Sequence, residues 1–412
     1  MTCRGAARAR RGREMAEIEV LRDAAVLLEG ERIAAVGPYS ELKSRTADVV
    51  EVSGVLFPGF VDCHTHAVFA APRLDDHARR AAGASYESIA AAGGGILESV
   101  RQVRAISEDD LTDRTAARIL TLLWHGSTTI EVKSGYGLDL PSEQKQLRVV
   151  QRLAAQLPLS LIPTFLGAHA VPPEFATRRA DYVKLLCDEM IPAVVRERLA
   201  LACDVFCEPG AFTPAESRSI LAAAQRHGLA TKLHADEFEG SGGAELGVEL
   251  GVLSVDHLAA ISDTGVRALG SAPTIAVLLP ATMVFLGRRA QAPARKLIAA
   301  GSAVALATDF NPGSSPTASL PLVMALGVSQ LGLSHGEAVI AATVNGAAAL
   351  GLAGDRGQLA AGFRADVVAC AVDDWREVAY WLGPNRVSAV WTAGSACPAP
   401  PAPLSLGPHD AA

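Results

Sequence analysis

The chain has 412 residues, of which 50% are hydrophobic and 20% charged, a balance typical of a globular protein that excludes a largely disordered one. Its length fits one large domain with a smaller one beside it. The formal net charge of −7 gives no support for binding to nucleic acid or anionic membranes, and no apolar stretch is long and uninterrupted enough to span a bilayer.

In chain order, the first predicted element is a pair of short strands within residues 23–36, which meet at a turn at Gly30. Two further strand-like runs, 363–372 and 387–392, lie near the other end of the chain. We expect these terminal segments to form one small β-sandwich domain. The predicted division is residues 1–54 and 356–397 for the small domain, 55–355 for a domain inserted between them, and 398–412 for a Pro-rich tail.

The middle of the chain alternates between apolar strand-like runs and segments of helical periodicity. Eight such units over about three hundred residues predict a (β/α)₈ barrel of the TIM type, in the α/β class. An open α/β sheet would instead need a Gly-rich phosphate turn after its first strand, and the sequence has none there. The strand-like runs are 55–61, 127–132, 160–166, 202–206, 230–233, 253–255, 274–279 and 303–307.

Two histidines, His64 and His66, follow the first of these runs. Side chains two residues apart on a strand point to the same side, so both imidazoles should aim at one point. This pattern suits a divalent metal such as zinc or iron. The alternative interpretation of the pair alone is two polar residues in a loop after a strand.

Other residues able to bind a metal also close apolar runs. His169, His234, His257 and Asp309 each stand at or just past the end of one. Taken singly, each could be a hydrogen-bonded residue at a strand end, but a buried aspartate there is costly unless it is paired or metal-bound. Active sites of (β/α)₈ barrels lie at the carboxyl ends of the strands, so the joint occurrence favours one site.

The seven cysteines are scattered, their number is odd, and no two have Cys-x-x-Cys spacing. We therefore expect reduced thiols in a cytoplasmic protein rather than a disulfide framework or a zinc-thiolate site.

Seven blocks of sequence resemble the amidohydrolase superfamily and, within it, the imidazolonepropionase family. The resemblance runs from about residue 23 to 357, and the Lys-Ser-Gly-Tyr-Gly and Asp-Phe-Asn-Pro-Gly motifs separate this family from other amidohydrolases. The blocks are 58–66, 92–96, 131–138, 164–173, 203–208, 232–238 and 308–314.

The resemblance implies metal-dependent hydrolysis of the cyclic amide of 4-imidazolone-5-propanoate to N-formimidoyl-L-glutamate, a step of histidine degradation. It also implies one Zn²⁺ or Fe³⁺ per chain, and the sequence does not choose between the two metals. The implied ligands are His64, His66, His234 and Asp309.

The resemblance further assigns catalysis to Glu237, His257 and Asp309. Glu237 would carry a proton from water to the leaving nitrogen, although an acid at this point is also common at a helix start. His257 would polarise the developing oxyanion or orient the water. The implied substrate-binding residues are Arg73 as a carboxylate clamp, with Tyr86, Tyr136, His169, Glu237, Asn311, Gly313 and Ser314.

Each substrate residue has a simpler interpretation as well. Tyr86 could be an ordinary aromatic residue of a surface helix, and Arg73 a solvated loop residue. The Asn-Pro-Gly of the last block is turn chemistry in its own right.

The chain departs from the family pattern at two places. Residues 69–73 read Phe-Ala-Ala-Pro-Arg where the family usually has a glycine after Phe-Ala, and Pro72 stiffens the loop that carries Arg73. The family also usually has one more strand than the sequence before Asp23 provides.

Two other functions stay open from the sequence. A related metal-dependent deaminase or cyclic amidase acting on another small ring would share the metal ligands, Glu237 and His257, whereas Arg73 favours a substrate with a carboxylate. A catalytically silent scaffold would be expected to lose ligands. The predicted partner is thus a small carboxylated molecule, with no nucleic acid or membrane, in a cytoplasmic protein that is compatible with a homodimer.

Overall fold

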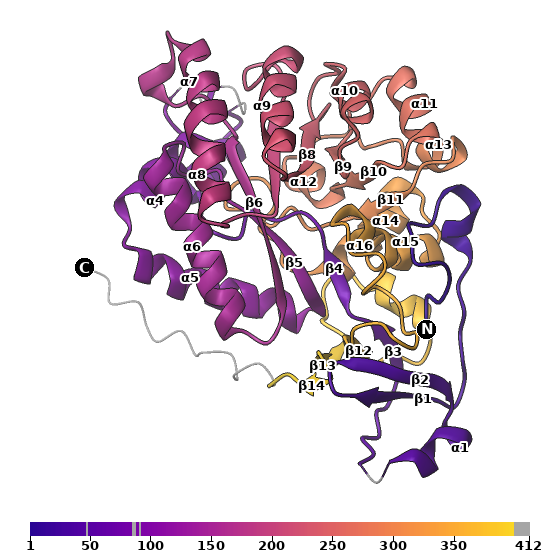
Figure 1. Cartoon of the computed structure of the whole chain (residues 1–412). Coiled ribbons are helices and arrows are strands. Elements are labelled where there is room, and N and C mark those ends of the chain that lie inside the picture. Colours follow the sequence, from indigo (N-terminus) through magenta and orange to yellow (C-terminus); the bar gives the residue numbers. More distant parts are fainter. Residues whose placement is uncertain (47, 85–87, 90–91, 399–412) are drawn as a thin grey trace.

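The computed structural model describes residues 1–46, 48–84, 88–89 and 92–398. Its largest part is a sheet of eight parallel strands in the order β4 to β11, curved into a barrel (Figure 1). The predicted fold class is therefore confirmed. The strands are β4 (Phe60–Asp62), β5 (Ser127–Lys133), β6 (Ser160–Ala168), β7 (Ala202–Cys207), β8 (Ala230–Ala235), β9 (Ser254–His257), β10 (Ile275–Leu278) and β11 (Val304–Leu306).

The barrel closes where the residues after β4 meet those after β11. The main-chain N–H of His66 donates to the carbonyl of Phe310 (2.9 Å), and the N–H of Asp309 donates to the carbonyl of His64 (3.0 Å). Closure at the carboxyl end of the barrel thus brings together the first and the last of the predicted metal ligands.

Helices surround the barrel, and several begin with a side-chain cap that the sequence supplies. Ser107, Asp139 and Thr213 each accept a main-chain N–H at the start of a long helix. In the described part of the chain, none of the helices combines the length and apolar character that a bilayer crossing requires. The helices are α2 (Leu74–Ala81), α4 (Ile96–Ala105), α5 (Glu108–Trp124), α6 (Leu140–Gln156), α7 (Arg179–Leu185), α8 (Ile191–Arg196), α9 (Pro214–Arg226), α10 (Gly243–Leu250), α11 (Asp263–Ser271), α12 (Pro280–Phe285), α13 (Ala294–Ala299), α14 (Leu320–Leu331), α15 (His335–Ala341) and α16 (Val344–Ala349).

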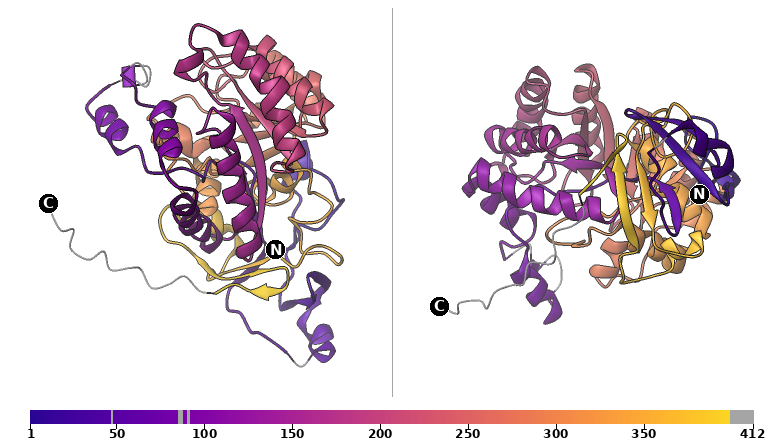
Figure 2. Two further views of the ribbon diagram at one scale, coloured as in Figure 1. Left: turned by 60° about the vertical axis from the view of Figure 1, so that its left-hand side comes forward. Right: turned by 90° about the horizontal axis from the view of Figure 1, so that it is seen from below.

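Two small antiparallel sheets lie together beside the barrel, and both ends of the chain contribute to them (Figure 2). One contains β1 (Ala24–Glu29) and β2 (Arg32–Pro38), which the short helix α1 (Tyr39–Leu42) follows. The sheets share a small core that includes Ile33 and Val367. The other sheet has the order β14 (Ser395–Ala396), β13 (Val387–Thr392), β12 (Val367–Cys370) and β3 (Val55–Pro58).

The apolar run 55–61 forms two strands rather than the single barrel strand that we predicted. Its first half is β3, which pairs with β12, and its second half is β4. Gly59 lies between them, where a Cβ atom would overlap Thr128 of the neighbouring barrel strand. The domain boundaries given above remain predictions, and β3 shows that the small sheet extends past residue 54.

Candidate active site

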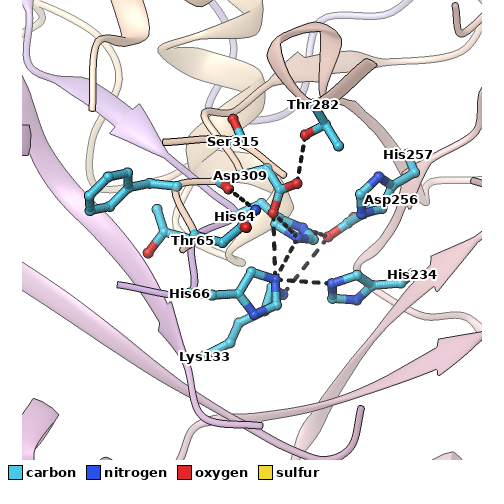
Figure 3. Close-up of polar contacts among 12 residues, drawn as sticks. His64, Thr65, His66, Lys133, His234, Asp256, His257, Thr282, Asp309 and Ser315 are labelled. Atoms are coloured by element: carbon cyan, nitrogen blue, oxygen red, sulfur yellow. Dashed lines mark hydrogen bonds and ion pairs between the residues drawn. The ribbon is translucent and has the colours of Figure 1, made fainter. Parts of the chain in front are cut away.

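A cluster of imidazoles and one carboxylate lies at the carboxyl end of the barrel (Figure 3). The Nε2 atoms of His64 and His66 are 3.3 Å apart, and so are those of His66 and His234. Oδ1 of Asp309 lies 3.6 Å from Nε2 of both His64 and His66. The structure thus brings all four predicted ligands together from three separate strand ends.

These separations fit a metal ion. Zinc binds imidazole nitrogen at about 2.0–2.1 Å, and two ligands of a tetrahedral ion at that distance lie about 3.3–3.4 Å apart. Burial lowers the pKa of His64 and of His66 well below the usual imidazole value, so both rings are neutral and can coordinate. Neutral nitrogens and a carboxylate that converge in a buried space are the donor set that zinc or iron takes.

Two buried aspartates orient the histidines from behind. Nδ1 of His64 is 2.5 Å from Asp256, and Nδ1 of His234 is 3.0 Å from Asp204. A carboxylate at Nδ1 keeps the proton on that nitrogen and leaves Nε2 free to face the ion. The hydrogen bond with Asp256 therefore fixes the tautomer and direction of His64, and the carboxylate of Asp204 is close enough to Nδ1 of His234 to favour the same tautomer there.

A network of buried charged side chains lies below the histidines and forms ion pairs with these aspartates. The ammonium groups of Lys133 and Lys232 lie 2.6 Å from Asp204 and Glu131, respectively. All the side chains concerned are at most 1% exposed. Three carboxyl groups (Glu131, Asp204 and Asp256) thus face two lysine side chains beneath the site.

The predicted catalytic residues face the same space. Nδ1 of His257 lies 3.5 Å from Oε1 of Glu237. Burial, and then the charges of Asp309 and Glu208, raise the pKa of Glu237 well above its ordinary value. Burial also raises the pKa of Asp309 to about 6, and a bound cation would reverse that shift by favouring the carboxylate.

The main chain is unusual at several of these positions. His257 and Asp309 have positive φ angles of 82° and 51°. Residues other than glycine rarely adopt such values, and those that do concentrate at functional sites. The strand ends therefore hold their side chains in positions that an ordinary strand exit would not provide.

One cavity joins this cluster to several of the predicted substrate residues, namely Arg73, Tyr136, His169, Asn311 and Ser314. Nδ1 of His169 lies 3.0 Å from the carbonyl oxygen of Gly135, and burial lowers its pKa to about 3, so this ring is neutral. Tyr86 lies outside the described residues.

Arg73 is buried beside this cavity rather than solvated. Its side chain is 5% exposed, and its Nε atom lies 3.9 Å from Asp76. Nε and Nη1 have no hydrogen-bond partner among the described residues. A Cβ atom on Gly313 would overlap Nη2 of Arg73, so the glycine leaves room for the guanidinium.

The side chain of Asn311 forms its hydrogen bonds within its own loop. Its Oδ1 accepts from the N–H groups of Gly313 and Ser314 (2.8 Å each), and its Nδ2 donates to the carbonyl of Asp309 (2.6 Å). The carboxamide thus shapes the turn that carries Asp309 and lets Gly313 approach Arg73.

The charged side chains that support the site were not predicted from the sequence. Glu131 and Lys133 stand two residues apart in a buried run, and so do Lys232 and His234. Charged residues within apolar strands need partners, so their alternation is a signal that could have indicated a polar barrel interior.

Comparison with known proteins shows which families and relatives the chain is similar to. The profile described as "Amidohydrolase family" matches residues 55–397, and that described as "Imidazolonepropionase-like composite domain, bacteria" matches residues 24–45. The imidazolonepropionase of Rubrobacter xylanophilus is 48% identical over 394 residues, which cover 94% of each chain. That of Deinococcus deserti is 48% identical over 386 residues, covering 93% of this chain and 94% of the relative.

Solved structures agree on the fold. The guanine deaminase of E. coli has a TM-score of 0.73 at 16% identity, with 96% of both chains covered. An adenosine deaminase from Xanthomonas campestris with bound zinc has a TM-score of 0.70 at 19% identity, covering 91% of this chain and 88% of the other.

Proposed function

The chain belongs to the imidazolonepropionase family of amidohydrolases, and we propose on this basis that it hydrolyses 4-imidazolone-5-propanoate to N-formimidoyl-L-glutamate in histidine degradation. Water adds across the ring C–N bond: the carbonyl carbon gains the hydroxyl, the bond breaks, and the nitrogen takes the proton. The resulting carboxylic acid, which then releases its proton to solvent, and the formimidoyl group account for every atom of the ring and the water.

We assign the metal to His64, His66, His234 and Asp309, as one Zn²⁺ or Fe³⁺ per chain. When bound, such an ion lowers the pKa of a coordinated water toward neutrality and polarises the carbonyl that is attacked. The convergence of three Nε2 atoms and one carboxylate oxygen supports this assignment.

Glu237 is the proposed proton carrier. Its carboxylate accepts the proton that the attacking water loses and delivers it to the ring nitrogen as the C–N bond breaks. Its raised pKa suits a group that must hold a proton for part of the cycle. His257, whose pKa burial lowers, is a neutral ring that can donate one N–H to the oxyanion.

Arg73 is the proposed carboxylate clamp, and the observation that carries the proposed substrate is its burial. Among the described residues, two buried guanidinium nitrogens of Arg73 have no hydrogen-bond partner, and the carboxylate of Asp76 is 3.9 Å away. Such desolvation is costly, and an anionic substrate tail would accept hydrogen bonds from these nitrogens. Tyr136, His169, Asn311, Gly313 and Ser314, with Glu237, complete the proposed binding surface, and Tyr86 remains a proposed contact.

The test is a comparison of substrates on one preparation of the protein. We expect rapid conversion of freshly generated imidazolone propanoate to N-formimidoyl-L-glutamate, identified by mass spectrometry, and negligible ammonia release from guanine, adenosine or cytosine. Ammonia release from a nucleobase or nucleoside, without ring opening of the imidazolone, would instead favour the deaminase alternative. A cytoplasmic location and a homodimer also remain proposals, which fractionation of native cells and sedimentation of the purified protein would test.

A further inference from the structure

A buried carboxylate outside the proposed catalytic set lies beneath the loop that carries Glu237. Glu208 follows β7 and is 4% exposed. It accepts hydrogen bonds from three consecutive main-chain N–H groups, those of Glu237 (3.1 Å), Phe238 (2.9 Å) and Glu239 (2.7 Å). These three residues lie between β8 and α10, where no strand or helix ladder uses their N–H groups.

The N–H groups in the second half of the same loop donate to a different residue, Asp236, which holds residues 241–244. Asp236 has a φ of 51°, and its carboxylate accepts from the N–H groups of Ser241 (2.8 Å) and Ala244 (3.0 Å) at the start of α10. Two buried carboxylates, each just past the end of a different strand, thus hold successive parts of the loop that begins at Glu237. The Glu237 side chain is left to point at His257.

We propose that Glu208 is a positioning residue for the reaction: it fixes the main chain of residues 237–239 so that the Glu237 carboxylate stays opposite His257 and Asp309. This inference rests on the proposed role of Glu237. A shift of the loop would break up to three hydrogen bonds at once and leave the buried N–H group of Glu237 without a partner, which is costly. Glu208 thus restricts Glu237 to one position before the substrate arrives.

A second buried glutamate holds another loop at the cavity in the same way. Glu143, in the first turn of α6, is fully buried and accepts from the N–H groups of Gly135 (3.0 Å), Gly137 (2.8 Å) and Leu138 (2.9 Å). This carboxylate holds the loop that carries Tyr136, which we place in substrate binding rather than proton transfer. The same substitution at Glu143 and at Glu208 therefore loosens two loops with different roles.

The experiment is Glu208→Gln in the metal-loaded full-length protein. Glutamine keeps the shape and one acceptor oxygen, but it places an N–H₂ group against main-chain donors. We expect hydrogen exchange at the amides of 237–239 to become faster while metal content stays at the wild-type value. We also expect kcat to fall about 10- to 100-fold, because a misplacement of about 1 Å can cost that much, with KM nearly unchanged.

A double-mutant cycle separates positioning from a general structural effect. In the Glu237→Gln background, Glu208→Gln should lower kcat no further, because no catalytic carboxylate remains to be placed. Glu143→Gln should instead raise KM, and its effect should multiply with that of Glu237→Gln. Should Glu208→Gln fail to fold, Glu208→Asp, which keeps the charge at a shorter reach, enters the same cycle.

Unchanged exchange at 237–239 together with unchanged kcat in Glu208→Gln would overturn the inference. So would a loss of kcat that multiplies in full with that of Glu237→Gln. Full turnover by Glu237→Gln alone would overturn the role of Glu237 and with it this one, and it is recognised without any change at Glu208.

Discussion

Replacement of Arg73 by alanine should lower kcat/KM for imidazolone propanoate more than for an analogue that lacks the carboxylate. The guanidinium is buried, and Nε and Nη1 have no partner among the described residues. One charge-assisted hydrogen bond contributes about 1.5–3 kcal/mol net, or roughly ten- to two-hundredfold in kcat/KM at about 1.4 kcal/mol per decade. The variant removes a desolvated cation but also leaves the buried carboxylate of Asp76 without the guanidinium 3.9 Å away, so thermal unfolding is recorded to separate a loss of stability from a loss of substrate binding.

The assay compares imidazolone propanoate with an analogue that lacks the carboxylate, together with metal content and thermal unfolding. Arg73→Lys should recover only part of the activity, because a point charge cannot reproduce the planar fork. Gly313→Ala should mimic Arg73→Ala, since its Cβ would displace the guanidinium. An equal loss for both substrates would refute the reasoning that Arg73 is held ready for an anionic tail.

The remaining predictions concern the metal and the proton carrier. His66→Ala and Asp309→Ala should each lose tight metal binding and activity together, as measured by elemental analysis and turnover, because each removes one of four converging donors. Glu237→Gln should keep the metal but lose about 10²- to 10⁴-fold in kcat, the usual worth of a positioned acid–base group. Asp256→Asn should weaken metal binding about 10- to 100-fold in a competition with a chromogenic chelator, because it loosens the orientation of His64.

For each of these predictions, a specific result would contradict it. Full metal and full rate in His66→Ala would remove it from the ligand set, and a loss below about tenfold in Glu237→Gln would remove that residue from the mechanism. Unchanged affinity in Asp256→Asn would show that packing alone orients His64. Glu143→Gln serves as a control for the last case, because it changes a buried carboxylate that contacts none of the four ligands.

The barrel and its ligands could be predicted because they depend on local signals. An apolar run marks a buried strand, and the residue that follows it must lie at the carboxyl edge of a parallel sheet. His64, His66, His234 and Asp309 each follow or end such a run, so their meeting follows from the topology.

The division of residues 55–61 into β3 and β4 could not be predicted in this way. The run is apolar almost throughout, since one half is buried in a small sheet and the other in the barrel, and periodicity does not distinguish the two environments. Only the pairing partners, β12 for β3 and β5 for β4, separate them.

The network of charged side chains beneath the site was not predicted from the sequence, for a different reason. Glu131, Lys133, Asp204, Lys232 and Asp256 lie on four strands. Only Glu131 and Lys133 share a strand, and both lysines pair with carboxylates of other strands. The ion pairs between different strands form only once the barrel closes. The carboxylates of Glu208 and Glu143 were missed likewise, because their partners are main-chain N–H groups that any sequence provides.

The measurement that tests the account most directly is steady-state turnover of freshly generated imidazolone propanoate, before and after removal of the metal by a chelator and after its return. We predict production of N-formimidoyl-L-glutamate by protein that holds about one zinc or iron ion per chain, loss of turnover in step with loss of the ion, and recovery on reconstitution. Turnover that persists in fully metal-free protein, or metal-loaded protein that leaves this substrate unchanged, would contradict it.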